Sequence, residues 1–132
     1  MQHNDRKQEV GAELQFLRFL DDGRFMLQRA ASGRHYFYPR IVEPGTGEEL
    51  EWVEAIGLGT VYSATVVRQR PPQKDYSVVL IDLDEGPRLM STVEGLSLEA
   101  VKIGLRVRAK VAALYGRNAV VFAPAEEISN ER

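Results

Sequence analysis

The sequence predicts a mainly β protein with one helix near its N-terminal end. Three observations support this prediction. Apolar residues recur at helical spacing in residues 10–20, short runs rich in β-branched and aromatic residues follow from residue 54 to about residue 127, and glycine, proline and acidic residues separate those runs. A chain of 132 residues is long enough to bury a core as one globular domain, or as a small subdomain joined to a larger one, without disulfides.

The composition sets limits on partners and location. The charged fraction of 27% and the hydrophobic fraction of 44% are ordinary for a globular protein, and a net charge of −2 gives no general attraction to nucleic acid or anionic membranes. The chain has no cysteine, which excludes disulfides and thiolate zinc ligands. The stretch "MQHNDRKQEVGAELQF" lacks the apolar run of a signal peptide or membrane span. We therefore expect a cytoplasmic protein without membrane contact.

Residues 1–23 are predicted to form a polar N-terminus and a short amphipathic helix. The apolar stripe of this helix consists of Val10, Leu14, Phe16, Leu17, Phe19 and Leu20. The "DDG" at residues 21–23 ends it. Two interpretations of the wide apolar face are open, because it can cover the core of the domain or dock on another subunit.

Residues 24–52 are predicted to form a small hairpin, which we call the clasp. Its expected strands are "RFMLQR" and "HYFYPR", on either side of a turn at residues 30–33. Pro39 ends the second strand, and "EPGTGEE" supplies further turn residues. The segment is too small to have a core of its own. We therefore expect aromatic packing to hold it, through Tyr36, Phe37, Tyr38 and Trp52.

Residues 53–127 are predicted to form a barrel, and residues 128–132 a polar tail. The expected strands are "GLGTVYSATVVRQR", "YSVVLIDLD", "PRLMSTVEG", "LRVRAKVAAL" and "AVVFAPA". The stretch "LSLEAVKIG" between the third and fourth strands predicts a short helix or turn. Five short strands with a connector after the third are typical of an OB-fold, a small partly open Greek-key barrel, and an SH3-like barrel is the alternative.

These segments, taken in order, resemble a known family. The aromatic-Pro-Arg strand, the "LEW" before the barrel, the "GLGTVY" entry and the "DLDEG" turn are similar to members of an acyl-CoA-associated family, which join an N-terminal rubredoxin-like zinc ribbon to a C-terminal OB-fold. The resemblance covers nearly the whole chain. It implies an accessory or scaffolding subunit that associates with thiolases, or with related aldolases or hydratases acting on acyl-CoA thioesters.

The resemblance also implies a zinc site, but this sequence departs from the family at the ligands. Members usually hold zinc through two Cys-x-x-Cys knuckles, and the corresponding positions here are Ala30, Ser32, Glu43 and Thr46. None of these residues supplies the sulfur or imidazole nitrogen of structural zinc sites. The two histidines, His3 and His35, lie at unrelated positions. We expect a degenerate, zinc-ribbon-like clasp without metal, and no cofactor.

The sequence favours a binding protein over an enzyme. His35 is expected to be an exposed strand residue, and no nucleophile lies at triad spacing from a base. The acidic run at Asp82, Asp84 and Glu85 fits a solvated hairpin turn better than paired catalytic carboxylates or a cation site. The glycines of "GLGT" lack the helix and lysine of a phosphate-binding loop, so they are expected to bend a strand.

Two binding hypotheses are open. An OB-fold can bind single-stranded nucleic acid through a basic groove lined with aromatics, but the predicted barrel has few aromatics beyond Tyr62, Tyr76 and Phe122. The hypothesis that we favour follows the resemblance, with docking on a thiolase-like acyl-CoA enzyme and with acyl-CoA as a candidate ligand. Its predicted partner-binding residues are Phe37, Tyr38, Pro39 and Arg40. Its predicted CoA-phosphate or anion-binding residues are Arg68, Arg70, Arg106 and Arg108.

Overall fold

The computed structural model describes residues 2–125, with side chains from residue 11 onward. The predicted polar tail at residues 128–132 lies outside these residues. The chain divides into two compact units. The first contains the N-terminal part of the chain through Ile56 together with Glu85–Pro87 and Val111–Ala119, and the second contains Gly57–Asp84, Arg88–Lys110 and the residues from Val120 onward. Among the described residues, no helix has both the length and the hydropathy needed to cross a bilayer.

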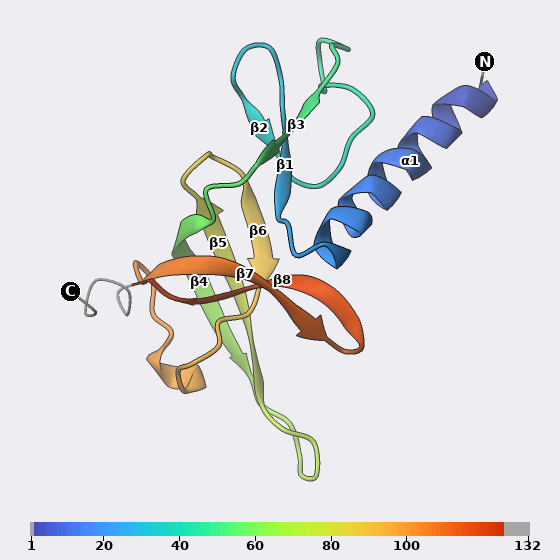
Figure 1. Cartoon of the computed structure of the whole chain (residues 1–132). Coiled ribbons are helices and arrows are strands. Elements are labelled where there is room, and N and C mark those ends of the chain that lie inside the picture. The colour runs from blue at the N-terminus through green and yellow to red at the C-terminus, as the bar shows by residue number, and fades with distance from the viewer. Residues whose placement is uncertain (1, 126–132) are drawn as a thin grey trace. The chain divides into compact units, whose positions relative to one another are not determined.

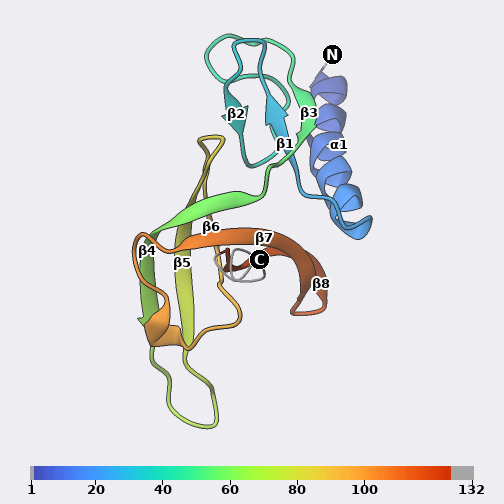
Figure 2. The same ribbon diagram turned by 60° about the vertical axis from the view of Figure 1, so that its left-hand side comes forward.

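The first unit combines a helix with a small antiparallel sheet. Helix α1 covers Gln2–Asp21, and the sheet has the strand order β2-β1-β3. The strands are β1 (Met26–Arg29), β2 (His35–Tyr36) and β3 (Glu51–Glu54), and Figure 2 shows α1 running alongside β3. Phe16 and Leu20 of the helix are buried, whereas Leu14 and Leu17 are 45% and 43% exposed. The apolar stripe of α1 therefore covers the core of this unit and also leaves an exposed apolar edge.

The clasp differs from the predicted two-stranded hairpin in two respects. The segment from residue 35 to residue 40 is a strand only at His35–Tyr36, and β3 adds a third strand that the sequence did not predict. Strand β1 lies in the centre, so that Gln28 is opposite both Tyr36 and Trp52. The second strand ends at Tyr36 for two reasons. The backbone after Tyr36 forms its hydrogen bonds outside the pairing with β1, and Pro39 has no N–H to donate to a neighbouring strand.

The second unit contains most of the barrel, while the end of β7 and the start of β8 belong to the first unit. The five-stranded sheet of the barrel, drawn in Figure 1, has the strand order β6-β5-β4-β7-β8, in which β4 is the middle strand. The strands are β4 (Leu58–Val67), β5 (Tyr76–Leu83), β6 (Arg88–Ser91), β7 (Arg106–Leu114) and β8 (Arg117–Pro124). Alternate residues point inward and are at most 1% exposed, as for Val61, Val79, Ile81, Val107 and Phe122. This alternation is the period-2 pattern from which the strands were predicted.

Contacts between residues 92–94 and β8 close the barrel. Val93 forms a parallel bridge with Phe122, Glu94 N–H donates to the carbonyl of Phe122 at 2.7 Å, and Phe122 N–H donates to the carbonyl of Thr92 at 3.0 Å. The connector after the third barrel strand is the 3-10 helix η1 (Leu98–Ala100). The nearly closed five-stranded antiparallel barrel confirms the predicted OB-fold.

Gly59 permits the close approach of β4 and β5. A Cβ atom at this position would lie 2.8 Å from both the carbonyl oxygen of Asp82 and Cγ2 of Ile81, which is closer than real Cβ atoms come. The register of β4 against β5 then shifts between Val61 and Ser63, which leaves Tyr62 as an extra residue on the exposed face. The "GLGT" motif therefore shapes the strand, as predicted.

Candidate functional site

The loop of residues 37–42, which we call the clasp loop, is attached to the sheet by one buried side chain. Gln28 on β1 is only 4% exposed. Its Oε1 accepts from the backbone N–H of Arg40 at 2.7 Å, and its Nε2 donates to the carbonyl of Arg40 at 2.8 Å. The amide thus bonds both backbone groups of Arg40, much as the peptide group of a neighbouring strand would. Sequence reasoning missed this role of Gln28, because a single glutamine in a short strand gives no local signal.

Aromatic packing holds the clasp, as predicted, but the helix supplies part of it. The ring of Phe37 is half-buried and meets Phe16 of α1 edge-on at a centroid distance of 5.6 Å, and Phe25 at 6.2 Å. Trp52 on β3 meets Phe19 of α1 at 5.3 Å. Phe37 therefore belongs to the core of the clasp rather than to a free surface.

Tyr38 and Arg40 are the predicted partner residues that face solvent. Tyr38 is 46% exposed, and its hydroxyl donates to Glu13 Oε2 at 2.9 Å. Partial burial and this hydrogen bond raise the pKa of Tyr38 above its ordinary value. The guanidinium of Arg40 lies over the ring of Tyr36, at 5.7 Å from the centroid, and Pro39 between them in sequence is half-buried.

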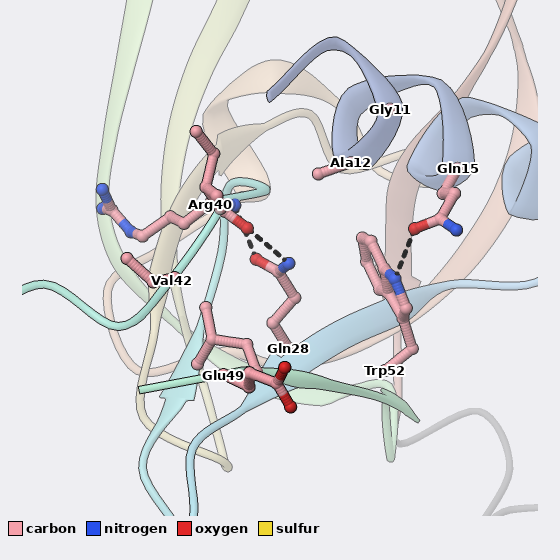
Figure 3. A pocket seen from close by; sticks show the side chains of 10 residues that line it. Gly11, Ala12, Gln15, Gln28, Arg40, Val42, Glu49 and Trp52 are labelled. Carbon is pink, nitrogen blue, oxygen red and sulfur yellow. Dashed lines mark hydrogen bonds between the residues drawn. The ribbon is translucent and has the colours of Figure 1, made fainter. Parts of the chain in front are cut away.

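A pocket of about 390 Å³ adjoins Arg40 and is drawn in Figure 3. The small residues Gly11 and Ala12 of α1 form one wall, and Trp52 forms another. The indole N–H of Trp52 donates to Oε1 of Gln15 at 2.8 Å, which fixes the ring against the helix. No sequence motif predicts this pocket, because its lining residues come from α1, β1, the clasp loop, residues 49–50 and β3, and each segment contributes only one to three of them.

The positions that correspond to the zinc knuckles of the resembled family do not suit a metal. Ala30 is buried and has no side-chain donor atom, and Ser32 Oγ accepts from the backbone N–H of Arg34. Glu43 is 6% exposed, and its carboxylate accepts from the Thr46 hydroxyl at 2.7 Å. Within residues 2–125 there is no group of three or more histidine, cysteine, aspartate or glutamate side chains arranged to hold a metal ion.

Ion pairs occupy two of the four arginines predicted to bind CoA phosphates. Arg68 donates to Asp75 and to Glu99, each at 3.0 Å. Arg106 binds both carboxylate oxygens of Asp84, at 2.8 and 2.9 Å, and this contact lowers the pKa of Asp84. Within the described part of the chain, no carboxylate forms an ion pair with Arg70 or Arg108, and both arginines are exposed.

The two predicted arginine pairs do not come together. Arg106 and Arg108 lie on β7 opposite Thr60 and Leu58, near the start of β4. Arg68 follows the far end of β4, which is at Val67. At about 3.3 Å per strand residue, the eight positions from Thr60 to Arg68 separate the pairs by roughly 25 Å. Arg70 belongs to the loop between β4 and β5. That loop projects from the end of these two strands (Figures 1 and 2).

The acidic turn is a set of ion pairs and hydrogen bonds. Asp82 binds Arg88 at 2.6 Å, and the Arg88 guanidinium carbon lies 3.4 Å from the ring centroid of Tyr62. The carboxylate of Glu85 accepts from the backbone N–H of Ile56 at 2.6 Å. His35, which we expected to be exposed, lies in β2 and is half-buried. None of these contacts forms a nucleophile–base pair.

Comparison with known proteins shows what the barrel is similar to. Residues 52–112 match the family described as the C-terminal OB-fold domain of ChsH2. The barrel is similar to the OB-fold domain of ChsH2. A chain of the solved structure "Ltp2-ChsH2(DUF35) aldolase" has a TM-score of 0.75 and 28% sequence identity, and the match covers 86% of this chain and 94% of that chain. The likeness to this ChsH2 neighbour therefore extends well beyond the barrel.

A curated relative is also similar to this chain. The protein described as "Probable enoyl-CoA hydratase alpha subunit", from Thermomonospora curvata, is 34% identical over 91 residues. The match covers 64% of this chain and only 28% of that relative, so the chain spans less than a third of its length. These likenesses confirm the resemblance to an acyl-CoA-associated OB-fold family. They name an aldolase and a hydratase subunit rather than a thiolase.

Proposed function

We propose that the chain is a non-catalytic accessory subunit that docks on an acyl-CoA enzyme, either an aldolase or hydratase or a related thiolase-like enzyme. The observation that carries the proposal is the match to 94% of the chain in the Ltp2-ChsH2(DUF35) aldolase structure. This proposal places the protein in the cytoplasm, in keeping with a sequence that contains no cysteine.

The contacts of the candidate acid–base residues support a non-catalytic role. Asp82 and Asp84 are held by Arg88 and Arg106, and the carboxylate of Glu85 accepts a backbone N–H. A general acid or base needs a proton that it can exchange with a substrate, often with a pKa moved toward neutrality. The pKa of Asp84 is instead moved down, away from neutrality.

The clasp loop is the proposed docking surface. Tyrosine and arginine are the residue types that most often dominate protein interfaces, and Tyr38 and Arg40 both face solvent. The bonds from Gln28 fix the backbone of Arg40 before any partner arrives. A preorganised loop loses less conformational entropy on binding, which favours affinity. Phe37 supports this surface from within the clasp and Pro39 lies half-buried beside it.

Acyl-CoA is the proposed ligand of the assembled complex. Arg106 and Arg108 lie on one face of β7, so this pair can act on one phosphate group, and Arg68 with Arg70 forms a second, separate candidate. Arg108 and Arg70 are the stronger candidates, because Arg68 and Arg106 already bind carboxylates.

Copurification tests the docking proposal. Tagged chain purified from its native cell should bring an acyl-CoA aldolase, hydratase or thiolase with it, and Tyr38→Ala with Arg40→Ala should abolish this while the protein stays folded. Lys102→Ala is the control, since Lys102 is an exposed cation outside the clasp loop. The proposal is wrong if no such enzyme copurifies. Single-stranded DNA binding that weakens steeply with added salt would favour the nucleic-acid alternative.

A further inference from the structure

Glu43 is a buried carboxylate that the proposed function does not use. Its Oε2 accepts from the Tyr36 hydroxyl at 2.8 Å, and its Oε1 accepts from the Thr46 hydroxyl at 2.7 Å. Its backbone N–H donates to the carbonyl of Glu48 at 2.8 Å, and its carbonyl accepts from Gly47 N–H at 2.9 Å. The backbone bonds close the turn at residues 43–48. The side-chain bonds connect that turn to β2.

The charges around Glu43 make its burial tolerable. A carboxylate that is 6% exposed is unfavourable unless donors or cations face it. Tyr36 and Thr46 supply the donors, and Arg34, whose guanidinium carbon is 5.5 Å from the Tyr36 ring centroid, supplies positive charge. The hydrogen bonds from Thr46 and Tyr36, with the charge of Arg34, lower the pKa of Glu43 in spite of its burial.

Tyr36 connects Glu43 to the clasp loop. The guanidinium groups of Arg34 and Arg40 both lie over the Tyr36 ring. The hydroxyl at the end of that ring donates a hydrogen bond to Glu43. A cation placed over an aromatic face is attracted by it, so the orientation of the ring sets where the guanidinium lies. Gln28 holds the backbone of Arg40 independently of this contact.

We propose that Glu43 is the positioning residue of the clasp: it fixes the Tyr36 ring through the hydroxyl, and the ring in turn fixes the side chain of Arg40. This inference concerns the conformation of the chain alone and does not rest on the proposed function. It predicts that the Tyr36 hydroxyl is needed, as well as the ring, to hold the Arg40 side chain in place. If Tyr36 acted by packing alone, the ring without its hydroxyl would be enough.

Nuclear magnetic resonance of the full chain tests the inference. The side-chain Nε–H proton of Arg40 should show a ring-current shift from Tyr36, and the backbone amides of Glu43 and Gly47, which are hydrogen-bonded across the turn, should exchange slowly with solvent. Tyr36→Phe keeps the ring but removes the donor to Glu43, so we expect it to reduce the Arg40 shift and to accelerate amide exchange at least tenfold. Glu43→Gln keeps one strong acceptor and should have an intermediate effect, and Glu43→Ala the full effect.

Glu48→Gln is the matched control, because Glu48 lies in the same turn, is exposed and bonds the backbone of Glu43 only through its carbonyl. It should leave both signals unchanged. If Glu43→Ala does not fold, as judged by circular dichroism, Tyr36→Phe and Glu43→Gln decide the question. The inference is overturned if these two variants keep the wild-type Arg40 shift and wild-type amide exchange.

Discussion

The side-chain amide of Gln28 bonds both backbone groups of Arg40, twelve residues away in the sequence, at 2.7 and 2.8 Å. A buried glutamine thereby gives an irregular loop the two hydrogen bonds that a strand would have provided. The exposed residues of the clasp loop are attached to a rigid sheet through this contact. Its energy can be measured without any partner protein.

Replacing Gln28 should destabilise the clasp. Gln28→Leu keeps most of the volume but leaves the N–H and carbonyl of Arg40 without this partner, and we expect a loss of about 1–3 kcal/mol in the free energy of unfolding. Urea denaturation measures this loss. Gln15→Leu is the control, because Gln15 is exposed and makes one bond, to Trp52. Equal effects of the two substitutions would contradict the role assigned to Gln28.

Two glycine-to-alanine substitutions should have opposite effects. Gly59→Ala places a Cβ atom 2.8 Å from backbone and side-chain atoms of β5, so we expect a loss of about 1–3 kcal/mol. Gly11→Ala lies within α1, has no atom within 4 Å of the new Cβ, and should stabilise the helix by up to about 1 kcal/mol. Thermal unfolding of both variants checks the signs. A neutral Gly59→Ala would show that β4 and β5 can separate.

Acid should destabilise the protein through three carboxyl groups. The pKa values of Glu43, Asp75 and Asp84 are lowered in the folded chain, first by hydrogen bonds from Thr46, from the Gln69 backbone N–H and from Arg106 respectively. The unfolded chain therefore binds protons more readily, so this stability is complete above the unfolded pKa values of about 4 and is lost as pH falls through the lowered folded values. The urea midpoint should fall steadily below about pH 5. A midpoint that is equal at pH 7 and pH 3 would be inconsistent with these shifts.

Metal should be dispensable for the clasp. The residues at the knuckle positions, Ala30, Ser32, Glu43 and Thr46, supply neither sulfur nor imidazole, and structural zinc sites are built from those groups. We expect elemental analysis of purified protein to give no stoichiometric zinc, and a chelator to leave the melting temperature unchanged. One zinc per chain, or a melting temperature that drops in chelator, would refute this prediction.

Acyl-CoA binding should depend on Arg108 more than on Arg106. Arg108→Glu should weaken binding at least several-fold in calorimetry of the complex, because it reverses a charge that no described carboxylate neutralises. Arg106→Ala should chiefly remove the exposed pair with Asp84 and lower stability by about 0.2–1 kcal/mol. Lys102→Glu is an exposed control elsewhere in the barrel. If binding is absent, or is indifferent to Arg68, Arg70, Arg106 and Arg108, these arginines are only a solvated surface.

The barrel was predictable from the sequence because its signals are local. Inward-facing residues such as Val79, Ile81 and Leu83 alternate with partly exposed ones, and Gly59 marks the point where two strands approach closely. The connector between the third and fourth barrel strands also lies where the spacing predicted it. Each of these features depends on a few neighbouring residues, so that no tertiary information was needed.

The clasp and its candidate site were less predictable because long-range contacts determine them. "HYFYPR" has strong strand propensity, yet only His35–Tyr36 is a strand, since Gln28 takes the hydrogen bonds of Arg40. Strand β3 (Glu51–Glu54) pairs with β1, which lies more than twenty residues earlier in the sequence. No short turn connects the two strands, so no local signal in the sequence predicts their pairing. The separation of the arginine pairs followed only from the register of β7 against β4.

The bridge between Val93 and Phe122 has a consequence during protein synthesis. Strands β4, β5 and β6 pair with their neighbours in sequence, so this meander can form while the ribosome is still adding residues. The segment after β6 cannot form its bridge until β8 has been made, and β8 is translated last among the described strands. Until then a sheet edge is open, and an open edge is a template for pairing with other nascent chains. The final strand therefore completes the barrel and also pairs a sheet edge that is open during synthesis.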